Sequence, residues 1–450
     1  MFQIRHYSAG RVDEQISVFL TIRVCSKPVI LLSRQGTSFD WKEIYQRMCG
    51  VAGILTVRGT AQGSLEALAT RMALAIRHRG PDDAGTWVDA QAGVALGHRR
   101  LSIVDLSPAG HQPMASAGGR FVIAFNGEIY NHLELRAELA STAAAPAWRG
   151  HSDTETLLAA FEHWGVEATL QKTVGMFAIA LWDKRERTLH LARDRFGEKP
   201  LYYGWVNGAF VFGSELKALR AYPGFANPVS REALALYMRF TYVPAPYSIY
   251  QGIYKLEPGC LLSVSRQPPT TGPFEPLRPP ASWQGVTLQR WWSLAQVVEA
   301  GARNPILDEQ DALTALEARL GDAIRLQSLA DVPLGAFLSG GVDSSAIVVL
   351  MQRQAAQPVK TFTIGFEEAG FDESPHARAV AQHLGTLHTE LFVTAAEARE
   401  VIPRLPAMYD EPFADSSQIP THLVCDAARQ HVTVALSGDA GDELFARHVR

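Results

Sequence analysis

The pattern of apolar and polar positions divides the chain into two parts, and the first is rich in strands. Four apolar residues at helical spacing predict a helix over 65–79, ended by the turn residues around it. A second helix is predicted over 154–164, with Ser152 or Asp153 as its N-cap. Short apolar runs predict strands over 48–54, 94–96, 121–125, 176–182, 188–192 and 209–212. Many strands with few helices indicate an α+β unit.

The second part alternates strands with helices. Helices are predicted over 311–329, 345–354 and 375–384, and strands over 334–338, 361–366, 388–393 and 432–436. Such alternation favours a mostly parallel sheet. Between the two parts, six prolines fall within 266–283, and we expect this stretch to form a surface excursion or linker without a ladder or helix.

Composition narrows the class of protein. The 450 residues suggest about three domains of roughly 150 residues each, or two large ones. Apolar residues make up 47% and charged residues 20%, which excludes a disordered charged tail or a fibre. The 42 basic residues face 46 acidic ones, so binding of nucleic acid by bulk charge is not expected.

Two further features concern location. The apolar stretch 16–32 is broken by Arg23 and Lys27, so we expect neither a signal peptide nor a membrane anchor. The cysteines lie far apart and form no CxxC pair, which argues against a zinc knuckle and a disulfide scaffold; they are Cys25, Cys49, Cys260 and Cys425. We therefore expect a cytoplasmic protein with no membrane or nucleic-acid partner.

Cys49 follows Met48, and removal of an initiator methionine would make it an N-terminal residue. An N-terminal cysteine carries its own base, because an α-amine has a pKa near 8. A buried structural cysteine is the plainer interpretation. An Asn-Gly pair after a strand, at Asn126 and Gly127, can donate to an oxyanion, although such pairs are usually turns. Arg100 with an aspartate can hold the charged groups of an amino acid, although such pairs usually lie on the surface.

Five strings occur in order: CGVAGI (49–54), RHRGPD (77–82), RLSIVD (100–105), NGEIYN (126–131) and SDTE (152–155). Together they resemble the class II glutamine amidotransferase domain of glutamine-dependent asparagine synthetases. Two more matching strings, RDRFGEKPLYY (193–203) and SELKAL (214–219), are expected to maintain the fold and not to catalyse.

The resemblance implies a four-layer αββα sandwich of the N-terminal-nucleophile type. It implies that Cys49 attacks the glutamine amide and that Asn126 and Gly127 form the oxyanion hole. The glutamine-binding residues would be Arg100, Asn126, Gly127, Glu128 and Asp153. The products would be glutamate and ammonia.

The string LSGGVDSS (338–345) lies between a predicted strand and a predicted helix, where glycines let the main chain approach phosphates. It is not a Walker A loop, because no Gly-Lys-Ser/Thr follows. A plain βα turn is the simpler interpretation. The whole string nevertheless resembles the pyrophosphate loop of ATP pyrophosphatases, and TFTIGF (361–366) is similar to their adenine-contacting strand.

This second resemblance implies an α/β ATP-pyrophosphatase-like domain that uses ATP and Mg²⁺. Aspartate would become β-aspartyl-AMP and react with ammonia passed on from the first site, giving asparagine, AMP and pyrophosphate. The implied ATP-binding residues are Leu338, Ser339, Gly340, Gly341, Asp343, Ser344, Ile364, Ser437 and Gly438. The implied ligands of Mg²⁺ are Asp343 and Asp442. The stretch 409–417 resembles a segment on the acceptor side in relatives, with no residue roles assigned. Relatives often form homodimers.

We predict four regions: an extension of doubtful status (1–47), the amidotransferase domain (49–260), a linker with a proline-rich insertion (261–300) and an incomplete synthetase domain (301–450). Relatives begin at the equivalent of Met48, so we expect that Met48 is the true start or that the extension is cleaved. After 445 the pattern departs from that of relatives, which suggests a truncated chain.

Three alternatives stay open. The acceptor could be a carboxylic acid other than aspartate. The chain could be a remnant with glutaminase activity alone, or an inactive one. A β-lactam synthetase is disfavoured because the set of Cys49, Arg100 and Asn126 is intact.

Overall fold

The computed structural model describes residues 48–57, 62–142, 145–366, 372–441 and 444, and the main chain of 23–25. The chain forms two compact units. The first unit comprises Tyr45–Trp292 together with Leu405–Asp415, and the second comprises Ser293–Arg404 and the residues from Ser416 on, with the described N-terminal strand. No helix in the described ranges is long and apolar enough to cross a bilayer.

The first unit contains two antiparallel sheets that pack face to face. The six-stranded sheet has the order β11 (Ile253–Lys255), β9 (Tyr202–Val206), β10 (Ala209–Gly213), β2 (Gly50–Leu55), β4 (Val94–Arg100) and β3 (Asp83–Asp89). The seven-stranded sheet has the order β13 (Ala281–Trp283), β14 (Val286–Arg290), β12 (Cys260–Ser265), β8 (Thr188–Arg193), β7 (Gly175–Asp183), β6 (Phe121–Ile129) and β5 (Met114–Ala115).

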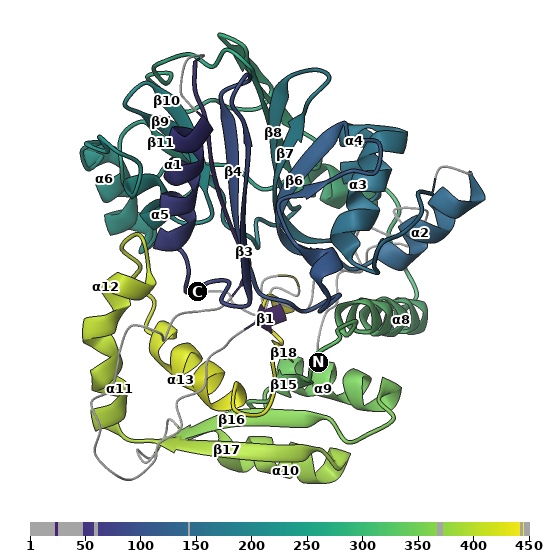
Figure 1. The fold of residues 1–450 in the computed structure, drawn as a ribbon. Coiled ribbons are helices and arrows are strands. Elements are labelled where there is room, and N and C mark those ends of the chain that lie inside the picture. The colour runs from purple at the N-terminus through teal and green to yellow at the C-terminus, as the bar shows by residue number, and fades with distance from the viewer. Residues whose placement is uncertain are drawn as a thin grey trace. The chain divides into compact units, whose positions relative to one another are not determined.

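Helices cover the outer faces of both sheets (Figure 1). On the six-stranded sheet lie α1 (Gln62–Ala75) and α5 (Leu216–Arg220). On the seven-stranded sheet lies α3 (Asp153–Trp164), which packs in turn on α2 (His132–Ser141) and α4 (Val166–Lys172). The other helices of this unit are η2 (Pro108–Gly110), α6 (Arg231–Phe240) and α12 (Leu405–Met408). The layers are αββα, which confirms the predicted sandwich.

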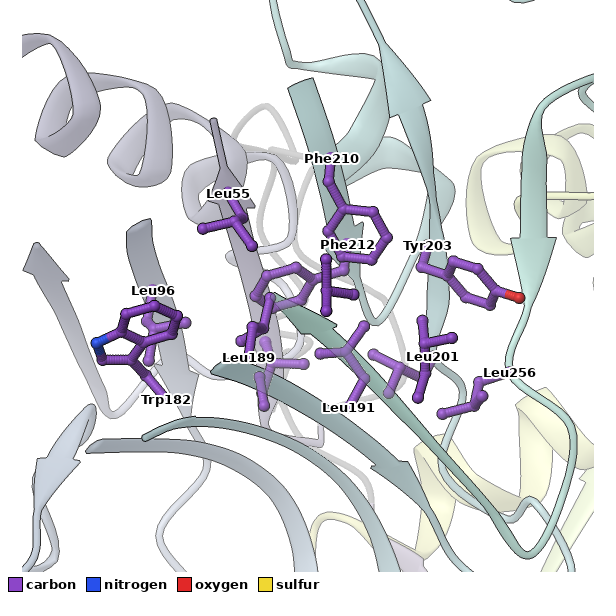
Figure 2. Close-up of a cluster of buried hydrophobic side chains, with 14 of the residues drawn as sticks. Leu55, Leu96, Trp182, Leu189, Leu191, Leu201, Tyr203, Phe210, Phe212 and Leu256 are labelled. Atoms are coloured by element: carbon purple, nitrogen blue, oxygen red, sulfur yellow. The ribbon is translucent and has the colours of Figure 1, made fainter. Parts of the chain in front are cut away.

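The main core fills the space between the two sheets (Figure 2). Trp182 and Leu191 from one sheet and Phe210 and Phe212 from the other are fully buried there. Each such side chain contributes about 1.5–3 kcal/mol by leaving water. Every residue of β7 is buried, because one face meets this core and the other meets the helical layer. A strand buried on both faces gives a continuous apolar run, which explains why the sequence predicted β7 well.

Local signals also predicted the helix ends. The Ser152 hydroxyl accepts a hydrogen bond from Glu155 N at 3.3 Å and caps α3, so the first of the two predicted N-caps is confirmed. The helix predicted over 65–79 begins three residues earlier, at Gln62, and ends at Ala75. Its last predicted residues form tight turns instead, in which Arg79 N donates to Ile76 O at 3.0 Å.

No strand or helix forms over 266–280, as predicted for the proline-rich stretch, but the predicted linker around it contains strands. Within the predicted linker, β12 and β14 pair with each other, and β12 also pairs with β8. Two aromatic residues hold the main chain of the proline-rich stretch. Trp205 Nε1 donates to Pro269 O at 2.8 Å, and Tyr254 Oη donates to Pro273 O at 2.9 Å. The linker prediction over 261–300 is therefore wrong for the residues up to Trp292, which complete the first unit.

The second unit contains one five-stranded sheet. Its order is β1 (Arg23–Cys25), β18 (Val434–Leu436), β15 (Leu334–Phe337), β16 (Lys360–Phe366) and β17 (Leu387–Val393). The last four strands are parallel, as predicted, and β1 pairs with β18 in the antiparallel sense. The helices of this unit are α7 (Leu294–Ala302), α8 (Glu309–Gln327), α9 (Val342–Gln354), α10 (Ser374–Leu384), α11 (Ala395–Val401), η3 (Ile402–Arg404) and α13 (Gln418–Ala428). Figure 1 shows α10 running along β17.

Candidate active sites

Cys49 lies directly before β2, where the neighbouring strand β4 ends. Its thiol is partly exposed, and Leu101 N donates to Cys49 Sγ at 3.4 Å. The main chain around the thiol is held from two sides. Arg79 Nε donates to Cys49 O at 3.0 Å, and Val51 N donates to Ser214 Oγ at 3.0 Å. The cysteine is therefore fixed at the start of β2, an inner strand of the six-stranded sheet, and is only partly buried.

Arg100 is the last residue of β4, next to Leu101, and is buried. Its guanidinium donates to the main-chain oxygens of the following loop, at 3.3 Å to Ser107 O and at close range to Asp105 O. The contact of Arg100 with Asp105 is thus one with the main-chain oxygen. A Cβ on Gly110 would lie 1.9 Å from Arg100 Nη2, so this glycine gives the guanidinium its space.

The carboxylate of Asp105 holds the loop instead. It accepts hydrogen bonds from Ser107 N at 3.1 Å, Ser107 Oγ at 2.5 Å and His151 N at 2.9 Å. Burial opposes the charge, but these donors hold the pKa of Asp105 below its usual value. Because His151 precedes Ser152, this carboxylate ties the loop after Arg100 to the start of α3.

Asp153 is the first residue of α3 and is buried. It accepts hydrogen bonds from Ile129 N at 2.9 Å and Thr154 N at 2.8 Å, so it braces the end of β6. Burial raises the pKa of Asp153, although His132 and the two N–H donors oppose the rise. Its partner Ile129 follows Glu128, which is also buried.

On the outer edge of β6, the row of main-chain N–H groups with hydrogen-bond acceptors has a gap at Gly127. Phe177 lies opposite Gly127 on β7, but both of its main-chain groups bond to Asp194. Phe177 N donates to Asp194 Oδ2 at 3.1 Å, and Asp194 N donates to Phe177 O at 2.9 Å. Gly127 therefore belongs to a non-hydrogen-bonded pair, and its N–H points away from β7. The neighbouring outward N–H groups, of Phe125 and Ile129, donate to side chains of Gln112 and Asp153 at 2.7 and 2.9 Å. Among the described residues, the Gly127 N–H between them has no such partner.

Asn126, beside Gly127, has a matching property. Its side chain is buried, and its Nδ2 makes no hydrogen bond within the described ranges of the chain. A buried amide without a partner costs about 1–3 kcal/mol. A Cβ on Gly127 would lie 2.1 Å from Met176 O, so the strand tolerates no side chain there. Two neighbouring donors are thus held rigidly and are available to an acceptor.

Several buried polar residues that support this region were not singled out from the sequence. Gln112 joins β6 to α3, because it accepts from Phe125 N and donates to Thr154 Oγ1 at 3.3 Å. His98 Nε2 donates to Phe125 O at 2.9 Å and so connects the two sheets, and burial lowers its pKa to about 4. No sequence signal distinguishes such residues from solvated ones, since their partners come from distant elements.

The second candidate site lies after β15. Ser339 Oγ and Ser344 Oγ are 2.9 Å apart, and Ser339 N donates to Ser344 Oγ at 3.2 Å. Gly340 has φ +82°, and a Cβ there would lie 2.6 Å from Ala377 N, so a side chain would be strained and blocked. Gly341 is the N-cap of α9 and has no side chain to cap it. The first N–H groups of a helix favour an anion, and here they lie directly after the two glycines.

A second loop, after β18, meets this one. A Cβ on Gly438 would lie 2.7 Å from Ser344 N, and a Cβ on Gly441 would lie 2.8 Å from Asp343 Cγ. Ser437 Oγ donates to Asp439 Oδ2 at 2.9 Å. The strands β15 and β18 are parallel neighbours, and a crevice at the carboxyl ends of such strands is the usual ligand position in open α/β sheets.

The remaining ATP-binding predictions fall around the same edge. Leu338 is buried and its N donates to Phe362 O at 2.9 Å, and Ile364 lies on β16. Asp442, the second predicted metal ligand, lies outside the described residues. The described part contains no group of three metal-ligating side chains. Asp343, the first predicted metal ligand, follows Gly340 and Gly341 in the chain and lies close to Gly441 of the loop after β18.

Comparison with known proteins distinguishes two domains along the sequence. A family model described as glutamine amidotransferase domain matches residues 48–275, and one described as asparagine synthase matches residues 315–448. An asparagine synthetase (glutamine-hydrolyzing) of Bacillus subtilis is 36% identical over 400 residues, which cover 88% of this chain and 58% of the relative. A Methanocaldococcus jannaschii protein with the provisional name asparagine synthetase (glutamine-hydrolyzing) 2 is 33% identical and is covered over 76% of its length, with 89% of this chain.

A solved structure of B. subtilis glutamine phosphoribosylpyrophosphate amidotransferase has 16% identity and a TM-score of 0.39, covering 76% of this chain and 65% of that one. The chain spans about 60% of the length of curated relatives that are 38% identical to it. With both family models matched in order, and with a relative 33% identical that is covered over 76% of its length, the chain belongs to the family of glutamine-hydrolysing asparagine synthetases.

Proposed function

We propose that the first unit hydrolyses glutamine at Cys49 and that the ammonia serves amide formation at the second unit. The observation that carries the proposal is the gap on the edge of β6. There, the Gly127 N–H and the Asn126 amide are two adjacent donors without a partner in the described part of the chain, while Gln112 and Asp153 hold the N–H groups on either side. Two fixed donors of this kind stabilise the oxyanion of acyl transfer.

The proposed reaction is acyl transfer through a thioester. Cys49 Sγ attacks the side-chain carbonyl carbon of glutamine, and the negative charge on its oxygen is stabilised by the Asn126 amide and the Gly127 N–H. The C–N bond then breaks, and ammonia leaves with the proton taken from the thiol. Water attacks the thioester, which releases glutamate and restores the thiol. We assign Arg100, Glu128 and Asp153 to binding the charged groups of glutamine.

The base in this scheme is the α-amine of Cys49, which requires that Met48 be absent from the active protein. An α-amine with a pKa near 8 accepts a proton readily at neutral pH. Mass spectrometry of the N-terminus of active protein tests this step. A chain that retains Met48 and has full glutaminase activity would contradict it.

For the second unit we propose that ATP activates the side-chain carboxylate of aspartate. The carboxylate oxygen bonds to the α-phosphorus, pyrophosphate leaves, and ammonia then attacks the acyl carbon and displaces AMP. We assign Ser339, Gly340, Gly341 and Ser344 to pyrophosphate, and Leu338, Ile364, Ser437 and Gly438 to adenosine. The first assignment is supported by the position of the glycines at the N-terminus of α9, where main-chain N–H groups favour an anion.

A magnesium ion fits the carboxylate of Asp343, with Asp442 as the second proposed ligand. Mg²⁺ keeps several waters and is usually held by one or two carboxylates and the substrate phosphates, so a cluster of three acidic residues is not needed. When bound, the ion would neutralise charge on the departing pyrophosphate.

One assay tests both parts. Purified protein is incubated with glutamine, aspartate and ATP-Mg²⁺, and glutamate, asparagine and pyrophosphate are followed separately. We expect all three products. Glutamate without pyrophosphate would restrict the chain to a glutaminase, and pyrophosphate formed only with another carboxylic acid would replace aspartate as the acceptor. Absence of glutamate would overturn the proposal for the first unit.

A further inference from the structure

The segment Leu405–Asp415 belongs to the first unit, although the chain on both sides of it belongs to the second. Two adjacent carboxylates fasten it. Asp410 and Glu411 have side chains only 8% and 9% exposed, and each faces a lysine of the first unit. Outside these two residues, Ala414 N donates to Thr241 O at 2.9 Å. The segment is thus a built-in part of the first unit that the second part of the sequence supplies.

Asp410 binds the string that begins at Ser214. Its Oδ2 accepts from Leu216 N at 2.6 Å, which satisfies an N–H of the first turn of α5, and its Oδ1 accepts from Lys217 Nζ at 2.7 Å. Glu215, the N-cap of α5, provides no cap of its own. Burial raises the pKa of Asp410, and Lys217 opposes the rise.

From Lys217 the contacts continue to the nucleophile. Lys217 Nζ lies 3.2 Å from Glu215 Oε2, and Arg79 Nη1 donates to Glu215 Oε1 at 2.8 Å. Arg79 in turn donates through Nε to Cys49 O at 3.0 Å. Arg79 is 4% exposed and Glu215 12%, so these charges interact with little screening by water. The path from Asp410 to the peptide group of the nucleophile consists of hydrogen bonds and ion pairs throughout.

Glu411 provides a comparison within the same segment. It accepts from Ile249 N at 2.7 Å and pairs with Lys255, and Tyr202 Oη lies 3.3 Å from its Oε2. None of these partners belongs to the path through Lys217 and Arg79. The two carboxylates therefore fasten the same segment, and within the described residues the path through Lys217, Glu215 and Arg79 to Cys49 starts from Asp410.

We propose that Asp410 is a positioning residue for glutamine hydrolysis, acting through Lys217, Glu215 and Arg79 on the main-chain carbonyl of Cys49. The proposal rests on the proposed glutaminase function. It makes the geometry of the nucleophile depend on a segment that comes from the second part of the sequence. Glu215 also contacts His78, whose Nε2 lies 3.0 Å from both of its carboxylate oxygens. Without the Asp410 charge, Lys217 is drawn further toward Glu215, where its charge competes with Arg79 for the same carboxylate.

The test compares Asp410→Asn with Glu411→Gln, since each removes one buried carboxylate from the segment. We expect Asp410→Asn to lower kcat for glutamate release about three- to tenfold with KM changed less than about twofold, a size typical of indirect coupling. Glu411→Gln should lower kcat by less than about twofold. Both thermal midpoints are measured, and labelling of Cys49 by an electrophilic glutamine analogue is followed by intact mass. The rate of Cys49 labelling should be lower in Asp410→Asn than in the wild type and unchanged in Glu411→Gln.

A double-mutant cycle with Lys217→Met isolates the path. If Asp410 acts through Lys217, Asp410→Asn should have little further effect in the Lys217→Met background, whereas Glu411→Gln should add to Lys217→Met. Equal losses in Asp410→Asn and Glu411→Gln, or additive losses of Asp410→Asn and Lys217→Met, would overturn the proposal. Wild-type protein that releases no glutamate would instead overturn the proposed function, so the two failures are distinguishable.

Discussion

The two candidate sites are built from different parts of the polypeptide. At the first site, the buried side chains of Gln112 and Asp153 bind the main chain of β6 on either side of Gly127 and hold the strand in place. Around the second site, the main chain itself makes the fit, and Gly340 and Gly438 are needed because a Cβ would meet a main-chain atom at 2.6 and 2.7 Å. The first site should therefore be sensitive to changes in side-chain chemistry, and the second to added bulk.

Removal of the Cys49 thiol has the largest expected effect, and it separates the activities proposed for the two sites. Cys49→Ala should reduce glutamate release by at least about 1000-fold, because no other group can form the thioester. Release of pyrophosphate with ammonium ions in place of glutamine should be retained, since that reaction does not use the thiol. Both rates are measured on the same preparation. Residual glutaminase activity near the wild-type level would exclude Cys49 as the nucleophile.

Asn126 tests whether side-chain chemistry controls the first site. Asn126→Ala should lower kcat about 100- to 1000-fold, or about 2.7–4 kcal/mol, by removing one oxyanion donor. Asn126→Asp keeps the shape but removes the N–H, so it should lose as much. Steady-state kinetics and thermal midpoints are compared for both variants. Full activity in Asn126→Asp would show that the donor is not required.

The pH dependence of the free energy of unfolding tests the burial of His98 between the two sheets of the first unit. Burial lowers its pKa from 6.5 to about 4, so the unfolded chain binds the proton first as the pH falls. The contribution of neutral His98 to the free energy of unfolding is fully present above pH 6.5 and is lost progressively down to about pH 4. Between pH 7 and pH 5 the free energy of unfolding falls by about 2 kcal/mol from this group. His98→Gln should reduce the pH dependence by that amount.

The measurement for His98 is urea unfolding at the two pH values, followed by tryptophan fluorescence. Eight of the nine tryptophans lie in Tyr45–Trp292, so the signal reports on the first unit. Identical pH dependence in wild type and variant would contradict the assignment.

Gly340 tests the second region and has the smallest expected effect. Gly340→Ala should weaken ATP binding about tenfold, because a side chain at φ +82° costs about 1–2 kcal/mol and also meets Ala377 N. Gly341→Ala should cost less than about threefold, since φ is −68° there and the nearest atom is the movable Ser339 Oγ at 3.3 Å. Calorimetric titration with ATP measures both. Equal losses would show that main-chain shape does not determine the second site.

The sequence predicted what depends on neighbours along the chain. Continuous apolar runs marked strands such as β7, and Ser152 marked the start of α3, because periodicity and capping are local. The resemblance named Asp343 and Gly438 but did not show that their loops touch.

The sequence failed where partners are distant. The prolines after Arg266 suggested a linker, yet the strands around them find partners in β8 and in each other. Gln112 and Asp105 are polar residues in a loop, and nothing local shows that they are buried and bonded to Phe125 and His151. The gap at Gly127 could be recognised only once the register of β6 against β7 was known.

The late position of Asp410 in the chain also has a consequence during translation. Lys217 leaves the ribosome 193 residues before Asp410 does, which at typical rates of synthesis takes about 10–40 s. Helices and hairpins form within microseconds, so the sandwich can assemble long before its last segment exists. The nascent chain therefore lacks the Asp410 contact throughout that interval. If that contact positions Cys49, the proposed hydrolysis of glutamine would reach its full rate only after Asp410 has been made.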